Sequence, residues 1–110
     1  MGTHMRDLTW SPAEKKIARR AFDLALQREF DAIIVEVKRQ AANIKEKSAL
    51  WELEDYLTKS RKEIDRKYDY RYSVLIMVFG VLIHQGWLSE DDLHGLGEDK
   101  LDSIRRITSI

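Results

Sequence analysis

Few side chains in this chain could support acid–base or metal chemistry, and their spacing suits neither. His84 and His94 lie ten residues apart, with Asp91 and Asp92 between them. Metal ligands on one helix are usually three or four residues apart, so we predict no metal site and place His84 at a helix end. The sequence has no glycine-rich phosphate loop, nucleophile elbow or HExxH motif, so we expect no catalysis and no cofactor.

The clustered carboxylates fit ion pairs better than catalysis. Acid–base catalysis needs two carboxylates in unlike environments facing one cleft. Here Asp55 precedes Lys59, and Glu63 precedes Lys67, each by one helical turn. We therefore predict exposed ion pairs on a solvated helix. A small enzyme is the alternative only if a deep pocket collects Asp55, Arg61 and a histidine.

A tryptophan and an arginine suggest binding instead. Trp51 precedes Asp55 by one helical turn, and buried Trp and Arg anchors dominate protein interfaces. Packing in a dimer explains Trp51 equally well. Arg61 shares an apolar stripe with Leu57, so we predict that it is half-buried with a partner. The charged stretch 61–71 could also be only a solvated face.

Composition narrows the class of protein. The 110 residues suit one domain, and 19 basic side chains balance 19 acidic ones, which argues against nucleic acid as the partner. No apolar run approaches the roughly 20 residues needed to cross a bilayer, so we expect no membrane insertion. The absence of cysteine fits a reducing compartment, and we expect a cytoplasmic protein. Residues 1–5 resemble a vector remnant, which leaves 6–110 as the domain.

Two long helices are expected to form a stalk. No helix breaker lies between Pro12 and Gly80. Ser11 and Glu14 can form a capping box around Pro12, and the apolar periodicity carries this first helix to about Lys45. Ser48 is the expected cap of the second helix. The short polar connection between the helices predicts an antiparallel hairpin over about 11–71.

A smaller helical head is expected over about 72–110. Residues 73–84 are apolar nearly all round, as in a central helix; a strand is the alternative because β-branched residues are frequent there. Gln85-Gly86 is a good helix stop. Acids at 89–92 begin a short helix, and a last amphipathic helix covers 98–107.

One side of the first helix lacks a partner within the chain. The second helix can cover only one face, which leaves the apolar side chains around Phe30, Ile34, Val37 and Ala41. We expect a homodimer to bury them. The alternative is a bent helix that wraps around its own head.

With these residues identified, the chain resembles the fluorescence recovery protein family. The resemblance covers nearly the whole chain after residue 5 and rests on Trp10-Ser11 and three longer stretches. These are Leu50-Trp51-x-Leu53-x-Asp55-x-Leu57; Arg61-x-Glu63-Ile64-Asp65-x-Lys67-Tyr68-Asp69-x-Arg71-x-Ser73-Val74; and Val78-Phe79, Leu82, Gly86, Leu93, Leu96, Asp99-Lys100 and Ile104.

The resemblance implies an all-α homodimer that acts by binding. Such proteins bind the C-terminal domain of light-activated orange carotenoid protein and speed its return to the resting orange form, which ends photoprotective quenching at the phycobilisome. The matching positions imply a partner-binding surface that contains Trp51, Asp55 and Arg61, and a dimer interface that contains Ile34 and Leu50.

Some positions depart from the pattern of the family. Glu54 stands where photoprotective members are expected to carry a histidine, and Met77 and Ser103 stand where an aromatic residue and a lysine are expected. The alternative function is therefore a dimeric helical adaptor or scaffold of the same family in a bacterium without a carotenoid protein, with an unknown partner. The expected partner-binding residues are Trp51, Glu54, Asp55, Arg61, Met77 and Lys100, and the expected dimer-interface residues are Phe30, Ile34, Val37, Leu50 and Trp51.

Overall fold

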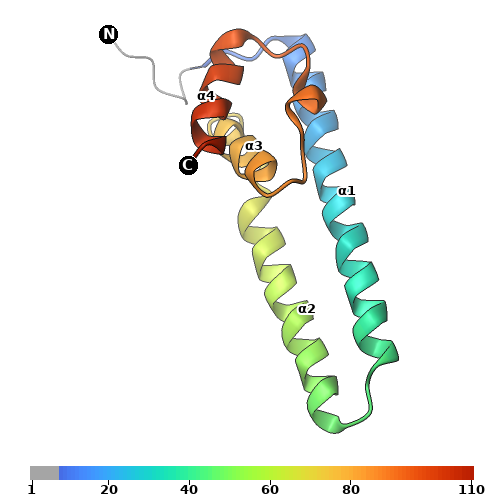
Figure 1. Cartoon of the computed structure of the whole chain (residues 1–110). Coiled ribbons are helices and arrows are strands. Elements are labelled where there is room, and N and C mark those ends of the chain that lie inside the picture. Colours follow the sequence, from blue (N-terminus) through green and yellow to red (C-terminus); the bar gives the residue numbers. More distant parts are fainter. Residues whose placement is uncertain (1–7) are drawn as a thin grey trace.

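The computed structural model describes residues 8–110, and the expected vector remnant lies outside this range. Four α-helices and one 3₁₀-helix make up the regular structure, and no strand occurs within 8–110. The molecule is elongated, with extents of 60 × 23 × 22 Å (Figure 1). The all-α prediction, with a helical stalk and a smaller head, is confirmed, and the segment 73–84 contains a helix and not a strand.

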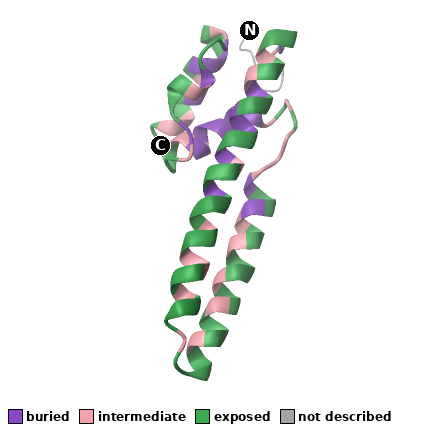
Figure 2. Ribbon diagram, turned by 90° about the vertical axis from the view of Figure 1, so that its right-hand side faces the viewer, coloured by how far each residue is buried: buried purple, intermediate pink, exposed green. Residues whose placement is uncertain are grey.

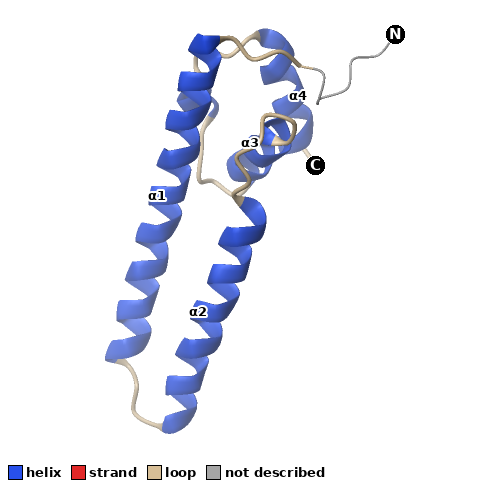
Figure 3. Cartoon of the chain, turned by 180° about the vertical axis from the view of Figure 1, so that it is seen from behind, coloured by secondary structure: helices blue, strands red, loops and turns tan. Residues whose placement is uncertain are grey.

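The stalk is an antiparallel hairpin of α1 (Pro12–Ala42) and α2 (Lys47–Lys67), seen from both sides in Figures 1 and 3. The predicted capping box starts α1. The Glu14 amide donates to Ser11 Oγ at 3.1 Å, and the Ser11 amide donates to Glu14 Oε1 at 3.0 Å. These bonds satisfy two amides that the first helical turn leaves without partners.

Both helix ends at the tip of the hairpin differ from the prediction. α1 ends at Ala42 and not near Lys45, because Asn43 leaves the helical conformation and donates from its side chain to the Arg39 carbonyl at 2.7 Å. α2 begins one residue before Ser48, with Glu46 at the cap position and no side-chain capping bond. Ser48 is therefore not the cap, and its hydroxyl lies inside the first turn.

The stalk also ends earlier than predicted, since α2 stops at Lys67 and not at residue 71. The next residues leave the helix because their aromatic rings pack on α1 and the head. Tyr70 meets Phe22 edge to face at 4.9 Å between ring centroids, and Tyr72 lies 5.6 Å from Trp10. Tyr70 and Tyr72 therefore pack against the core that α1 shares with the head.

The head consists of α3 (Leu75–His84), the 3₁₀-helix η2 (Glu90–Leu93) and α4 (Glu98–Thr108), packed against the first half of α1. Figure 2 shows that burial is concentrated there, whereas most of the stalk is exposed or half-buried. The predicted stop after α3 is confirmed, because Gly86 adopts a φ of +87°, which glycine tolerates without strain. The core contains Trp10, Ala18, Ala21, Phe22, Ala25, Leu75, Ile76, Val78, Phe79, Leu82, Leu88, Leu93, Leu96, Leu101 and Ile104.

A buried charge cluster ties α4 to the start of α1. Lys100 Nζ lies 2.6 Å from the Thr9 carbonyl and 3.1 Å from the Glu14 carboxylate. The same carboxylate accepts the Gly97 amide at 2.8 Å. Burial alone raises the pKa of the Glu14 carboxyl, but the bonds from the Ser11 and Gly97 amides and from Lys100 outweigh it and lower the pKa to about 2.

We expect this cluster to make part of the stability depend on acid pH. A carboxyl whose pKa is lower in the folded chain stabilises the fold fully above its ordinary value of 4.5 and loses that effect as the pH falls toward 2. The melting temperature of Glu14→Gln should therefore lie below that of the wild type at neutral pH and approach it in acid. Glu52→Gln, at an exposed position, is the control. A difference that stayed constant down to pH 2 would contradict this role of Glu14.

Candidate functional site: a charged groove on the stalk

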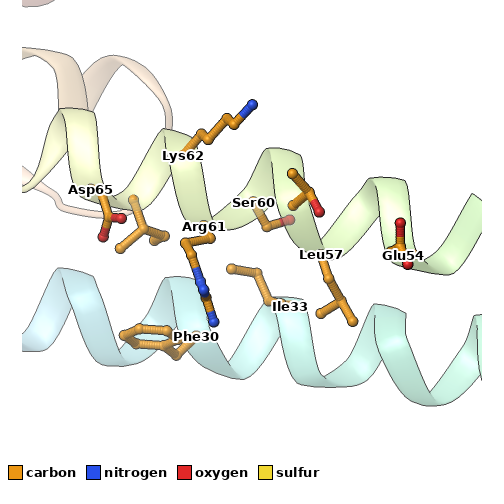
Figure 4. Close-up of a pocket in the computed structure, with 10 residues that line it drawn as sticks. Phe30, Ile33, Glu54, Leu57, Ser60, Arg61, Lys62 and Asp65 are labelled. Atoms are coloured by element: carbon orange, nitrogen blue, oxygen red, sulfur yellow. The ribbon is translucent and has the colours of Figure 1, made fainter.

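A groove of about 780 Å³ runs between α1 and α2 (Figure 4). Its apolar lining comes from both helices, and its charged lining comes from α2. Phe30, Ile33, Leu57 and Ile64 supply the apolar side chains, and Glu54, Arg61, Lys62 and Asp65 supply the charges. An apolar surface with a few polar groups is the usual composition of a surface that binds another molecule.

Arg61 is the central charge of this groove. Figure 4 shows it extending from α2 toward α1, with its guanidinium beside Phe30. Its side chain is exposed, and no hydrogen bond or ion pair to it occurs within residues 8–110, so the prediction of a half-buried, paired arginine is wrong. The reason is that the hairpin is open on this side. Five guanidinium donors are thus available to another molecule.

Trp51 and Asp55 lie on α2 outside the groove. Both are exposed, and 59% of Trp51 is accessible to solvent. Since Asp55 is two residues from Leu57, it lies about 200° around the helix from the groove. The structure therefore brings Glu54 and Arg61 to one groove and leaves Trp51 and Asp55 outside it.

The predicted ion pairs of α2 are replaced by others. No ion pair joins Asp55 to Lys59 within the described chain, and Glu63 pairs with Arg66 at 2.6 Å and not with Lys67. Lys67 instead turns inward to α1. The one-turn spacing on a single helix could not reveal this choice, because it ignores partners on the neighbouring helix.

The junction of stalk and head contains an ionic network that the sequence did not indicate. Lys67 Nζ contacts the Glu29 carboxylate at 2.7 Å and the Gln85 side-chain oxygen at 2.7 Å. The Tyr68 hydroxyl donates to the same carboxylate at 2.9 Å, and burial together with this bond raises the pKa of Tyr68. Lys67 and Glu29 are each 7% exposed. One available signal was the position of Glu29 one turn after Ala25, on the buried side of α1.

Exposed apolar side chains share the side of the stalk that carries the groove. Phe30 is 43% exposed and Ile34 49%, and Leu50 and Leu57 reach 47% and 45%. Val37, the remaining residue of the expected dimer interface, is half-buried. A row of large, solvent-exposed apolar side chains indicates a surface suited to binding a protein partner or a second copy of the chain.

The two expected partner-binding residues of the head have different environments. Met77 on α3 is 47% exposed and available for contact. Lys100 is only 2% exposed and is held by Glu14 and Thr9. Its assignment to the partner-binding surface is therefore corrected: the charge of Lys100 stabilises the packing of α4 on α1, and its ammonium group is not accessible to a partner.

The described residues offer no centre for metal chemistry. Within 8–110, no group of three or more histidine, cysteine, aspartate or glutamate side chains could hold a metal ion. His84 lies at the end of α3, with Nδ1 3.0 Å from the Thr108 carbonyl. In the same range, no helix is both long enough and apolar enough to span a membrane.

An elongated helical hairpin with an open, charged and apolar groove is typical of a protein that acts by contact with another macromolecule. A family model described as "Photoprotection regulator fluorescence recovery protein" matches residues 10–108. The chain belongs to this family of non-enzymatic photoprotection regulators.

Individual relatives agree with this membership over nearly the full chain. The fluorescence recovery protein of Synechocystis is 40% identical over 101 residues, which cover 92% of this chain and 93% of that protein. The solved structure of the Fremyella diplosiphon fluorescence recovery protein is 45% identical, with a TM-score of 0.90 over 93% of this chain and 100% of that one. The Synechocystis structure is 39% identical, with a TM-score of 0.89 and the same coverage.

Proposed function

We propose that this chain is a cytoplasmic, homodimeric regulator that binds photoactivated orange carotenoid protein and accelerates its return to the resting orange form. Family membership supports the regulatory role. The open stalk groove supports the choice of the binding surface. There the Arg61 guanidinium lies beside Phe30 without an ion-pair partner in the described chain (Figure 4).

The proposed mechanism is a shift of an equilibrium. A bound protein favours one conformation of its partner only by the difference between its affinities for the two conformations. We infer that the chain contacts the C-terminal domain of the carotenoid protein more favourably in the compact arrangement. Trp51, Glu54, Asp55 and Arg61 on the stalk and Met77 on the head are the proposed contacts, because all five are exposed.

Homodimerisation is proposed on the same side of the stalk. Phe30, Ile34 and Leu50 are each more than two-fifths exposed, and Trp51, which follows Leu50 on α2, is 59% exposed. Covering apolar surface releases water and stabilises association. A second copy offers the same apolar row and so matches it in length and character.

Binding can be tested by size-exclusion chromatography of mixtures with an orange carotenoid protein, run in the dark and under blue light. We expect co-elution that is stronger under blue light, and a complex of the chain's own two copies when it is run alone. Separate elution under both conditions would contradict the proposed partner, and a monomer at all concentrations would contradict the proposed dimer.

A helical adaptor for a different protein is the second candidate. It is favoured by Glu54, which places two adjacent exposed acids on α2 where photoprotective relatives are expected to have a histidine before the aspartate. The recovery activity of the variant Glu54→His distinguishes the two candidate functions. If recovery activity is absent in the wild type and appears in this variant, the wild-type surface is adapted to another partner.

A further inference from the structure

A basic row lies near the start of α1, which is blue in Figure 1. It consists of four exposed cations within six consecutive positions: Lys15, Lys16, Arg19 and Arg20. Like charges three or four residues apart on a helix repel each other. Glu14, the one acid among positions 12–20, does not neutralise the row, because its carboxylate is turned inward to Lys100. This part of α1 therefore has an excess of positive charge, although the whole chain is neutral.

Two cations of the basic row lie over aromatic rings of the segment that links α2 to the head. Lys15 Nζ lies 5.1 Å from the ring centroid of Tyr72, and the Arg19 guanidinium lies 4.6 Å from that of Tyr70. The face of an aromatic ring attracts a cation at such distances. The rings therefore orient both cations and leave their charge in place.

The two tyrosine rings are themselves fixed by packing. Their centroids are 5.6 Å apart, and each ring also contacts a buried aromatic residue, Phe22 for Tyr70 and Trp10 for Tyr72. Burial and the neighbouring Tyr72 hydroxyl raise the pKa of Tyr70 to about 12, so Tyr70 adds no negative charge at neutral pH. A cation held in one place before binding loses less entropy when an anion binds it.

Both oriented cations keep donors for another molecule. Lys15 makes no ion pair within residues 8–110. Arg19 donates from Nε to Asp23 at 3.2 Å, and its terminal N–H groups make no hydrogen bond in the same range. Both side chains of this pair are more than half exposed, and such surface pairs contribute little to stability. A carboxylate of another molecule can therefore compete for the guanidinium.

The basic row lies on the side of α1 that carries the groove. Arg19 and Phe30 are eleven residues apart, which is about three full turns and about 16 Å along the helix axis. A protein that lies along the groove and extends toward the head therefore reaches the row. Because the cations extend over more than one helical turn, they match several carboxylates in succession better than one small anion.

We propose that the basic row, with Lys15 and Arg19 as its oriented centre, binds an acidic segment of the protein that occupies the groove. Complementary charges of this kind orient two proteins and speed their association. The inference rests on the proposed function only in that the occupant of the groove is a protein. It is tested without a carotenoid protein, so either proposal can fail while the other holds.

A capped peptide of six glutamates is the probe, and isothermal titration calorimetry at low salt measures its dissociation constant. We expect Lys15→Gln with Arg19→Gln to bind the peptide at least about fivefold more weakly than the wild type. The matched control is Lys38→Gln with Lys45→Gln, which removes the same charge from exposed positions toward the tip of the stalk. We expect this control to stay within about twofold of the wild type. A wild type that does not bind the peptide, or equal losses in the two double variants, would overturn the proposal.

Two further comparisons test the kind of anion and the role of the rings. Inorganic phosphate that binds as tightly as the peptide and displaces it would overturn the acidic segment in favour of a small anion. Tyr72→Phe keeps the ring and should stay within about twofold of the wild type, whereas Tyr72→Leu should bind about threefold more weakly. Equal affinities of these two variants, both shown to be folded by circular dichroism, would contradict the orienting role of Tyr72. The glutamine variants change exposed side chains, so they decide the proposal even if Tyr72→Leu does not fold.

Discussion

Arg61→Leu should reduce the recovery activity of the chain at least about tenfold, because truncating a central arginine of an interface commonly costs more than 1.4 kcal/mol, a factor of ten in binding. The guanidinium lies in the groove without an ion-pair partner in the described chain, so its loss removes donors that the carotenoid protein would use (Figure 4). The measurement is the rate of red-to-orange decay at limiting concentrations of the variant.

The fold and the dimer should survive this change. Leucine adds apolar surface beside Leu57 and introduces no like charge, so we expect the variant to remain dimeric in sedimentation velocity. Arg66→Leu is the matched control, since Arg66 is also exposed on α2 but pairs with Glu63 away from the groove. Equal activity of Arg61→Leu and the wild type would remove Arg61 from the proposed site.

Lys67→Met should destabilise the fold by about 3–5 kcal/mol, the typical result of removing one partner of a buried ion pair. The change leaves the Glu29 carboxylate, itself 7% exposed, without its ammonium partner and also removes the bond to Gln85. Because these contacts join α1, α2 and the end of α3, we expect the head to loosen from the stalk. Urea unfolding followed by circular dichroism gives the free energy of unfolding.

A second substitution distinguishes an unpaired charge from a general packing defect. In Lys67→Met with Glu29→Gln, the buried carboxylate is replaced by a neutral amide that still accepts from the Tyr68 hydroxyl. We expect this double variant to regain more than half of the lost stability. If it is no more stable than Lys67→Met, the methionine itself packs poorly and the ion pair is not the cause.

The helices could be predicted from the sequence because their signals are local. The capping box at Ser11 and Glu14 and the stop at Gly86 each depend on neighbouring residues, and the structure confirms both. The tip of the hairpin was predicted less well. The end of α1 depends on the Asn43 side chain turning back to the Arg39 carbonyl, and several polar residues nearby could have ended the helix equally well.

The side-chain partners could not be predicted in the same way, because they come from distant parts of the chain. Lys100 was expected at the partner-binding surface, but Glu14 at the start of α1, 86 residues earlier, supplies the carboxylate that holds it inside. Lys67 likewise passes over its helical neighbour Glu63 for Glu29 on the other helix. Periodicity predicts which face of a helix is buried, but it does not predict which residue of another element contacts that face.

The candidate site was predictable in part. Trp51, Asp55 and Arg61 predicted a binding surface on the second helix, and the structure shows a groove there that contains Arg61 but not Trp51 or Asp55. Whether that surface is covered could not be deduced, since an apolar stripe is identical in a buried and an open hairpin. The exposed fractions of Phe30 and Leu57 supply this missing information.

The proposed acceleration of the recovery of a photoactivated carotenoid protein can be tested by a direct optical measurement. An orange carotenoid protein is converted to its red form with blue light, and its decay to the orange form is followed in the dark with and without the chain. We expect faster decay, with a rate that increases with the concentration of the chain. An unchanged decay rate, with a chain shown to be folded and dimeric, would contradict it.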